Sequence, residues 1–365
     1  MASLSGSFHL LYLFDVAEEI RIDELRKILR IEKPEREPGF GHLAPSYVRF
    51  EHPPIEEQVA AVRTESGDLF PARMRYFDYG VAVLELEASF EGEDWPGVIA
   101  LAGRWIGAPE MECLAEARIA SGLEQVAGAL HKPFSRRLFE DYCVVELREV
   151  LEDGAPADAA RLVERYGAEI AQIVRGESQA LSATERGEVL ASSISYSPGD
   201  LMVAGWTAAV IYDAQPESAA AMRQLLEYAN TQLLEFRHYD EVLSGVLKEL
   251  YQLMERRPGV LRRWHMIRQA QKLNAIRLEV MELSERADTA IKFLSDVFYA
   301  RAFKMAAARI GAPDYRLLVD EKVKAAGELY RFLMEEFHHA RAFVLEFLVV
   351  VILIIDLIYL FRGKT

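Results

Sequence analysis

Cysteine is scarce in this sequence and short catalytic motifs are missing, which narrows the possible functions. The chain has two cysteines, Cys113 and Cys143, too few for a disulfide framework or a cysteine-based zinc site, so a reducing compartment is expected. It contains no GxxxxGK[ST] loop, no GxGxxG fingerprint, no GxSxG elbow and no CxxC pair. We therefore expect no enzymatic activity, no cofactor and no metal site.

Basic residues are outnumbered by acidic ones, 42 to 57, giving a formal charge of −15. Binding to nucleic acid depends on neutralising phosphates with Lys and Arg, so no direct nucleic-acid partner is expected. One dense basic stretch occurs, ERRPGVLRR at 255–263. A basic, Arg-rich leader is also missing at the N-terminus, which predicts that the bulk of the chain stays in the cytoplasm.

What the sequence has, instead, is a long apolar segment, AFVLEFLVVVILIIDLIYLF at 342–361. About 20 apolar residues are enough for a helix to span a bilayer. The segment predicts a single-pass, tail-anchored protein of the plasma (bacterial inner) membrane. Its two acids, Glu346 and Asp356, are costly in hydrocarbon and are predicted contacts to another membrane helix. Glu335 and His339 have helical i, i+4 spacing, but a third metal ligand is absent, and a solvated face is the preferred interpretation.

Residues 1–213 predict an α+β head domain. Alternation of apolar residues indicates strands at 8–16, 56–64, 72–80, 81–89, 142–150 and 189–197, the last forming a hairpin with 201–213. Helical spacing indicates helices at 21–30, over most of 95–140 and at 157–174. Ser182 and Glu185 suggest a capping box. The order strand, helix, paired strands occurs twice, from Phe8 and from Tyr142, which suggests a possible pseudo-repeat.

From 214 to 341 the sequence predicts a stalk of long antiparallel helices leading to the anchor. Helices are expected at about 216–257, 260–310 and 314–361, separated by Pro258–Gly259 and Gly311–Pro313. The second helix carries an apolar seam with alternating spacings of three and four. Its members are Leu273, Ile276, Val280, Leu283, Ala287, Ala290, Leu294 and Val297. This pattern suits a coiled coil or an ordinary bundle core.

Two groups of polar and aromatic residues are candidate interaction or structural networks. Arg237, Tyr239 and Asp240 crowd one helical turn, in which Arg237 and Glu241 have the spacing of a stabilising pair. Tyr76 and Asp78 belong to the sequence YFDYG, in which an Asp–Gly turn joins two strands. A structural role is the preferred interpretation of both groups, with a partner or ligand site as the alternative.

Three stretches resemble the required-for-meiotic-nuclear-division family, a domain of unknown function. They are ARMRYFDYGVAVLE at 72–85, LLEFRHYDEVL at 233–243, and Leu345–Glu346 followed by an acid ten residues later. That acid is Asp356, where Glu is more usual in the family. The resemblance implies a membrane-anchored α+β protein with a helical stalk and no established catalysis. Eukaryotic members are linked to mitochondrial translation; without a transit peptide, this chain resembles a bacterial-type member.

These observations predict a membrane-anchored, self-associating scaffold or interaction protein facing the cytoplasm. Its expected partners are the membrane, further copies of itself and a protein of unknown identity. Two alternatives remain: a ligand-binding sensor or enzyme in the α+β head, or a membrane tether that supports translation, by family analogy. A deep pocket in the head would favour the first, and a basic face including Arg256 and Arg262 would favour the second.

Overall fold

The computed structural model describes residues 2–31, 54–152, 154–254, 268, 271–281 and 297–362, and within them it describes all side chains except those of 253–254, 333–347, 356 and 359–362. The chain divides into two compact units. The first contains Met1–His238 and Glu285–Tyr315, and the second contains Tyr239–Ser284 and Arg316–Thr365.

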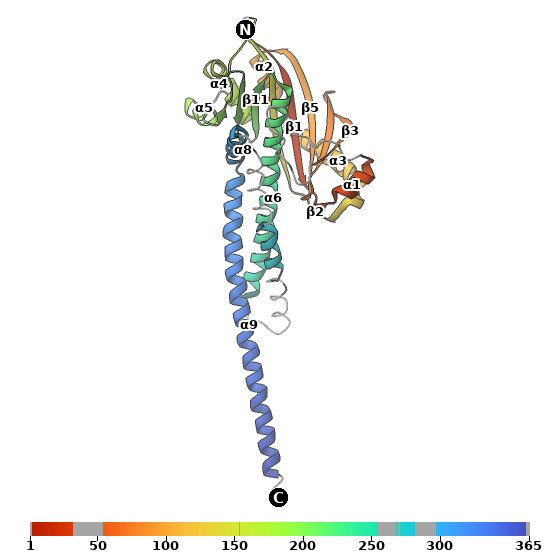
Figure 1. Cartoon of the computed structure of the whole chain (residues 1–365), viewed down its shortest axis with the longest axis vertical. Helices are drawn as coiled ribbons and strands as arrows, with labels where there is room; N and C mark the ends of the chain where they lie inside the picture. Colours follow the sequence, from red (N-terminus) through yellow and green to blue (C-terminus); the bar gives the residue numbers. More distant parts are fainter. Residues whose placement is uncertain are drawn as a thin grey trace. The chain divides into compact units, whose positions relative to one another are not determined.

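A mixed β-sheet forms the centre of the first unit (Figure 1). Its strands are β1 (Ser3–Asp15), β3 (Ile55–Arg63), β4 (Leu69–Tyr76), β5 (Val81–Glu93), β7 (Phe139–Glu152), β8 (Ala155–Pro156), β9 (Ser193–Ile194), β10 (Asp200–Ala204) and β11 (Ala208–Asp213). The order is β3-β4-β5-β1-β7-β11-β10-β9, with β8 paired to β7. Neighbouring strands are antiparallel except for the parallel pair β7 and β11. A small separate sheet joins β2 (Ala17–Ile20) to β6 (Leu130–Pro133).

The strand order is symmetric about its centre, as the suggested pseudo-repeat implies, but the two halves are not copies of one topology. On one side β1 is followed outward by β5, β4 and β3, and on the other β7 is followed by β11, β10 and β9. The strand next to β1 is antiparallel to it, whereas the strand next to β7 is parallel to it. The second half therefore needs a crossover connection, which the helices between β7 and β9 provide.

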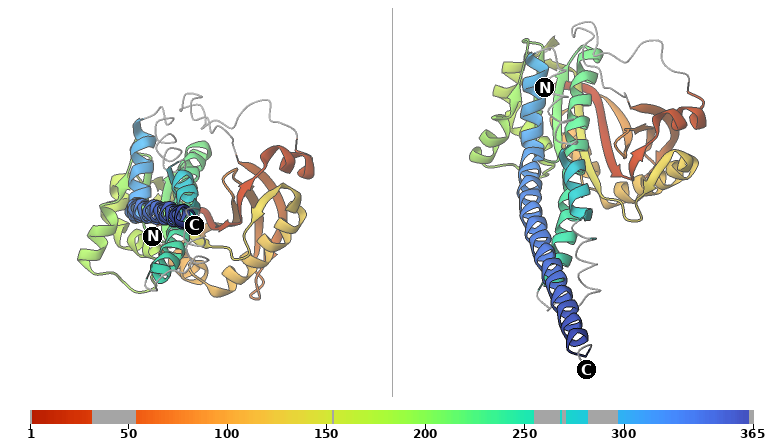
Figure 2. Two further views of the ribbon diagram at one scale, coloured as in Figure 1. Left: turned by 90° about the horizontal axis from the view of Figure 1, so that it is seen from below. Right: turned by 60° about the horizontal axis from the view of Figure 1, so that its bottom comes forward.

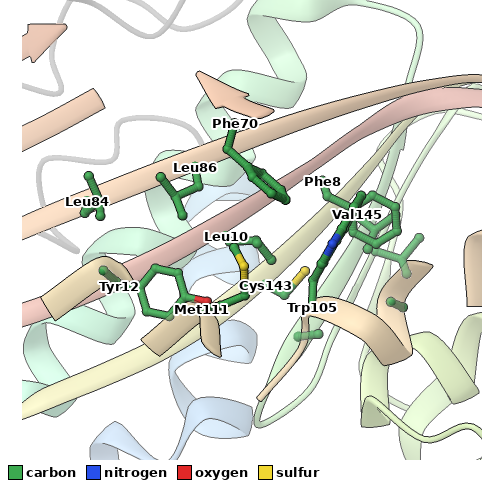
Figure 3. Packing of buried hydrophobic residues seen from close by; sticks show 14 of the residues in the cluster. Phe8, Leu10, Tyr12, Phe70, Leu84, Leu86, Trp105, Met111, Cys143 and Val145 are labelled. Carbon is green, nitrogen blue, oxygen red and sulfur yellow. The ribbon is translucent and has the colours of Figure 1, made fainter. Parts of the chain in front are cut away.

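Helices cover one face of the sheet and bury the larger apolar core. They are α1 (Ile22–Leu29), α2 (Trp95–Trp105), α3 (Pro109–Gln125), a short 3₁₀ turn η1 (Ala127–Ala129), α4 (Ala159–Arg175) and α5 (Ala183–Leu190). Figure 3 shows Phe8, Phe70 and Trp105 packed together in this core. Phe8 and Phe70 both meet the Trp105 ring edge-on, at centroid distances of 5.0 and 5.3 Å. Such edge-on contacts suit the opposite polarity of ring edges and faces.

The opposite face is covered by α6 (Pro216–Met254) and α8 (Val297–Ile310). The residues Leu11 and Leu13 of β1 point to this face, whereas Leu10 and Tyr12 point to the other, as the two-residue period of a strand requires. Because β1 is covered on both faces, neither side of the strand is exposed to solvent, and residues 8–16 are all buried. The two views in Figure 2 show the helices distributed over the sheet of this unit.

The second unit is helical. It contains the C-terminal part of α6, a helical segment at 271–281, and α9 (Ala312–Arg362) from Arg316 onward. Three predicted seam residues, Leu273, Ile276 and Val280, are buried. Val297 is 75% exposed, so it does not extend the seam. The remaining seam positions at 283–294, and the basic stretch at 255–263, lie outside the described residues.

Two local predictions were wrong in the first unit. The strand predicted at 189–197 is largely absent, because α5 continues to Leu190 and β9 contains only Ser193–Ile194. The predicted hairpin with 201–213 is present only in this short part, where Ser193–Ile194 pairs antiparallel with Met202 and Val203. A second hairpin lies within 200–213, where β10 and β11 pair through a turn at Gly205. The helical prediction for 95–140 missed β6 and the start of β7. Ser182 does cap α5, accepting from the Glu185 N–H at 3.2 Å, while the Glu185 carboxylate binds Arg175.

The structure contradicts the predicted transmembrane anchor at 342–361. Within the part of the chain that is described, no helix is both long enough and apolar enough to cross a membrane. The membrane partner, the single-pass topology and the plasma-membrane location were inferred from this segment and are corrected with it. The side chains of Glu346 and Asp356 lie outside the described ones.

Candidate functional site: a buried charge cluster between the sheet and helix α6

Seven charged or titratable side chains meet between the sheet and α6, and we call them the charge cluster. They are His9, Arg73, Arg75, Glu85, Glu146, Arg223 and Glu227. They come from four neighbouring strands and one helix: β1, β4, β5, β7 and α6. Buried charges are rare unless paired, so their concentration in one place singles out this region.

The strand alternation explains why these residues face α6. His9 is in phase with Leu11 and Leu13, which belong to the core on that face, and Glu85 is in phase with Val83. Glu146 is likewise two residues beyond Val144. On α6, Arg223 and Glu227 are four residues apart, so they share one side of the helix. The polar residues therefore replace apolar ones at regular core positions.

His9 lies at the centre of the cluster, with only 2% of its surface exposed. Its Nδ1 is 2.7 Å from Glu85 Oε1. Its Nε2 is 3.1 Å from Arg223 Nη1, 3.3 Å from Ser7 Oγ and 3.5 Å from Glu146 Oε2. Arg223 also forms an ion pair with Glu146. Each nitrogen of the imidazole thus has partners, and they come from both the sheet and α6.

Arg75 joins the sheet to α6 at the other side of the cluster. Its Nη1 is 2.8 Å from Glu85 Oε2, and its Nε is 2.7 Å from Glu227 Oε1. Arg73 lies nearer the solvent, with Nη2 3.6 Å from Glu85 Oε1 and 3.0 Å from Glu87 Oε2. Arg223 Nε is 3.5 Å from Glu85 Oε1, so Glu85 contacts His9 and three arginines and is the shared acceptor of the cluster.

The pKa directions in the cluster reflect a competition between burial and pairing. Burial alone raises the pKa of a carboxyl group. For Glu85 and Glu146 this effect is outweighed by hydrogen bonds from His9 and by the arginine charges, so both pKa values are lowered. For Glu227 the effect of burial prevails over Arg75, and the neighbouring Glu85 charge adds to it, so its pKa is raised. Burial lowers the pKa of His9, but Glu146 and Glu85 raise it by more.

A second polar group ties α6 to β1 and β7. His238 Nδ1 is 2.5 Å from Asp15 Oδ2, and the His238 ring stacks on Phe134 at a centroid distance of 4.7 Å. Arg237 forms an ion pair with Glu140 of β7. Burial raises the pKa of Asp15, although the bond to His238 opposes this effect. Together with the charge cluster, this group holds α6 to the sheet through polar contacts at both ends of the interface.

The other residues singled out from the sequence lie in three different places. Asp240 Oδ1 is 2.5 Å from Lys322 Nζ of α9, within the second unit, and Tyr239 is half-buried beside it in sequence. Tyr76 is fully buried in the core on the opposite face, with its hydroxyl 3.3 Å from Glu57 Oε2. Asp78 lies in the turn between β4 and β5, where its carbonyl oxygen accepts from the Ile20 N–H. Sequence proximity therefore did not bring these residues into one site.

The charge cluster was missed by the sequence analysis, although a signal for it exists. Glu85 in VAVLELE and Glu146 in VVELRE interrupt apolar alternation at positions that face inward. In the turn between β4 and β5, the tyrosine that bonds α6 is Tyr79 and not Tyr76. The Tyr79 hydroxyl lies 2.9 Å from the hydroxyl of Thr231. A charged residue in phase with buried apolar residues on several strands would have indicated this site.

The chemistry available to this arrangement is proton binding and charge pairing. Among the described residues, no group of three or more His, Cys, Asp and Glu side chains could hold a metal ion. The side chains of Glu335 and His339 lie outside the described ones. Cys143 is buried, and burial raises its thiol pKa, which disfavours the reactive thiolate.

These features define an α+β protein whose mixed sheet is covered on both faces and carries a buried charge cluster on one of them. Residues 5–219 match the model of a family described as "Uncharacterized protein MJ0711, N-terminal domain". The match covers more than half of the chain, which therefore belongs to this family. It includes the sheet from the third residue of β1 onward and the first residues of α6. No curated protein and no solved structure matches the chain.

Proposed function

We propose that this chain is a non-catalytic scaffold that assembles copies of itself through α9. The observation that carries the proposal is an apolar surface on this helix. Its large hydrophobic side chains, each about half exposed, are Leu348, Val349, Val350, Ile352, Leu353, Ile354, Ile355, Leu357 and Ile358. Exposed apolar surfaces of this kind mark interaction sites, because removing them from water is favourable.

The distribution of these residues supports a partner that surrounds the helix. Positions 348–355 are all apolar and cover about two helical turns, so every side of the helix is apolar. A helix that is hydrophobic on all sides is normally buried on all sides. One partner helix would cover only one side, whereas a bundle of identical helices buries every member equally.

Further exposed hydrophobic residues in the second unit support the same conclusion. Tyr251, Leu278, Met281, Leu317 and Phe332 are all about half exposed or more. The 271–281 segment thus buries Leu273, Ile276 and Val280 while it exposes Leu278 and Met281. Helices with apolar residues on a second side have room for additional helical partners.

Sedimentation-velocity measurements on the purified full chain, in buffer and in mild detergent, test the proposal. We expect the wild-type chain to form oligomers, and the double variant Val350→Asp with Ile354→Asp to sediment as a monomer, because two carboxylates would be buried in the bundle. Leu69→Asp is the matched control, since Leu69 is equally exposed but lies on β4. A monomeric wild-type chain, or one that binds phospholipid vesicles as a monomer, would overturn the proposal.

A sensor is the second candidate, with a ligand bound by the first unit. It is favoured by α6, which is one uninterrupted helix with residues in both units, so a change at the charge cluster has a direct covalent route out of the first unit. The experiment is a thermal-shift screen of small charged metabolites on the wild-type chain. Stabilisation that disappears in Arg73→Gln would support this candidate.

The resemblance to the required-for-meiotic-nuclear-division family stays a proposal beside the family assignment. Support comes from the position of two of its motifs: 72–85 forms the β4–β5 pair, and 233–243 lies on α6. A role as a tether for translation has only this analogy in its favour. Copurification of ribosomal subunits with the full chain at physiological salt is the observation that would support it.

A further inference from the structure

The hydrogen bonds of His9 require one protonation state at each nitrogen. Glu85 can only accept when ionised, so Nδ1, 2.7 Å away, carries a proton and donates. Arg223 can only donate, so its bond of 3.1 Å to Nε2 requires an unprotonated nitrogen there. In this arrangement His9 is neutral and accepts from α6.

A protonated Nε2 has an alternative partner within reach. Glu146 Oε2 lies 3.5 Å from this nitrogen and is an acceptor. Protonation from solvent would therefore replace the bond accepted from Arg223 with one donated to Glu146. It would also place two positive charges, an imidazolium and a guanidinium, side by side in a buried site, where repulsion is poorly screened.

The charged groups that surround His9 have opposite effects on its protonation, and each effect can be assigned to the strand or helix that carries the group. Glu85 and Glu87 of β5 and Glu146 of β7 favour the protonated ring. Arg73 and Arg75 of β4 and Arg223 of α6 disfavour it, and Glu227 of α6 is engaged with Arg75. The two side-chain hydrogen bonds that raise the His9 pKa come from strands, whereas the Arg223 charge that lowers it comes from α6. Displacing α6 would therefore make protonation easier, and by reciprocity protonation favours displacement.

We propose that His9 is a proton-operated latch for α6, in which protonation at Nε2 breaks the bond from Arg223, forms one to Glu146 and loosens the N-terminal part of α6 from the sheet. The latch is independent of whether α9 self-associates, because it lies wholly within the first unit. It makes the attachment of α6 responsive to pH in the range where a histidine titrates.

Two measurements on the wild-type full chain test the latch. The ¹⁵N NMR shifts of labelled histidine give the protonation state of His9 Nε2 against pH. Hydrogen exchange followed by mass spectrometry, corrected for intrinsic rates, gives the protection of 216–238. We expect Nε2 to be unprotonated at high pH and protonated at low pH. Protection of 216–238 should fall with the same midpoint. The fall should be about tenfold for each unit by which docking of α6 lowers the pKa of His9.

Variants separate the latch from a purely structural histidine. Glu146→Gln should lower the midpoint of both curves, because the protonated ring loses its anionic acceptor. His131→Gln is the matched control, since His131 lies outside the cluster and bonds Arg21; it should leave both curves unchanged. The latch is wrong if protection of 216–238 stays constant while His9 titrates, or if the pH dependence survives in His9→Gln.

Discussion

At the scale of single residues, the charge cluster depends on arginines that cannot lose their charge. Arg75 contacts Glu85 and Glu227, both almost fully buried, and so balances two carboxylates that would otherwise lack a counter-ion on that side. Burying a charge without a partner costs far more than a surface pair gains. The stability of this region is therefore more sensitive to the loss of one arginine than to the loss of an exposed pair.

Replacing Arg75 tests this argument. We expect Arg75→Met to lower the free energy of unfolding by about 3–5 kcal/mol, the usual cost of removing one partner from a buried ion pair. Urea unfolding followed by circular dichroism measures the loss. Arg161→Met is the control, because the Arg161 side chain is 72% exposed and its ion pair with Asp158 is long, at 3.9 Å. Loss of this exposed pair should change stability by less than about 1 kcal/mol. Equal losses in the two variants would contradict the interpretation.

Two glycines with nearly the same φ angle allow the cost of backbone strain to be measured separately from the cost of a steric clash. Gly67 and Gly80 have φ values of +94° and +95°. A Cβ on Gly67 would meet nothing within 4 Å, whereas one on Gly80 would lie 1.9 Å from the carbonyl oxygen of Ala17. We expect Gly67→Ala to cost about 1–3 kcal/mol through strain. Gly80→Ala should cost at least about 2 kcal/mol more, measured by thermal unfolding, and similar values would show that the turn can relax.

At the scale of elements, local patterns predicted much of the secondary structure. Apolar alternation located β1, β4, β5 and β7, and helical spacing located α1, α4 and α6. The failures have a physical reason: Ser193–Ile194 is too short for alternation to be informative, and β6 pairs with β2 over a sequence distance that no local pattern reports. The charge cluster was missed for the same reason, since the strands that carry its members are adjacent in the sheet but far apart in the sequence.

A capping residue provides the prediction at this scale. Asp158 caps α4, with Oδ1 accepting from the Arg161 N–H at 2.7 Å. Asp158→Ala should lower the free energy of unfolding by about 1 kcal/mol because that N–H loses its acceptor. Asp158→Asn keeps an acceptor oxygen and should restore most of the loss. If both variants lose the same amount in urea unfolding, the carboxylate charge rather than the cap is the important property.

At the scale of the whole molecule, pH acts through carboxylates whose pKa values folding changes. Glu85 and Glu146 have lowered pKa values, so their contribution to stability is present above the unfolded value of about 4.5 and is lost as pH falls through the folded values. His9 acts in the opposite sense. Its pKa is raised, so its contribution is present below about 6.5 and is lost as pH rises through the folded value.

The pH dependence of unfolding should therefore change when Glu85 is neutralised. We expect Glu85→Gln to be much less stable than the wild-type chain at pH 7. The difference should shrink by about 1.4 kcal/mol for each pH unit below about 4.5, because the unfolded chain then takes up a proton that folded Glu85 does not. Urea unfolding at several pH values between 3 and 7 gives this difference. A difference that stays constant over the range would show that Glu85 does not titrate with folding.

The central position of the first strand has a consequence for synthesis of the protein. β1 pairs with β5 and β7, which begin at Val81 and Phe139. A nascent chain therefore carries the sequence FHLLYLF without β5 until Glu93 has been made, and without β7 until Glu152 has been made. Such a segment is prone to associate with other chains. We expect ribosome-associated chaperones to bind the emerging N-terminal segment and to release it once β7 has been translated.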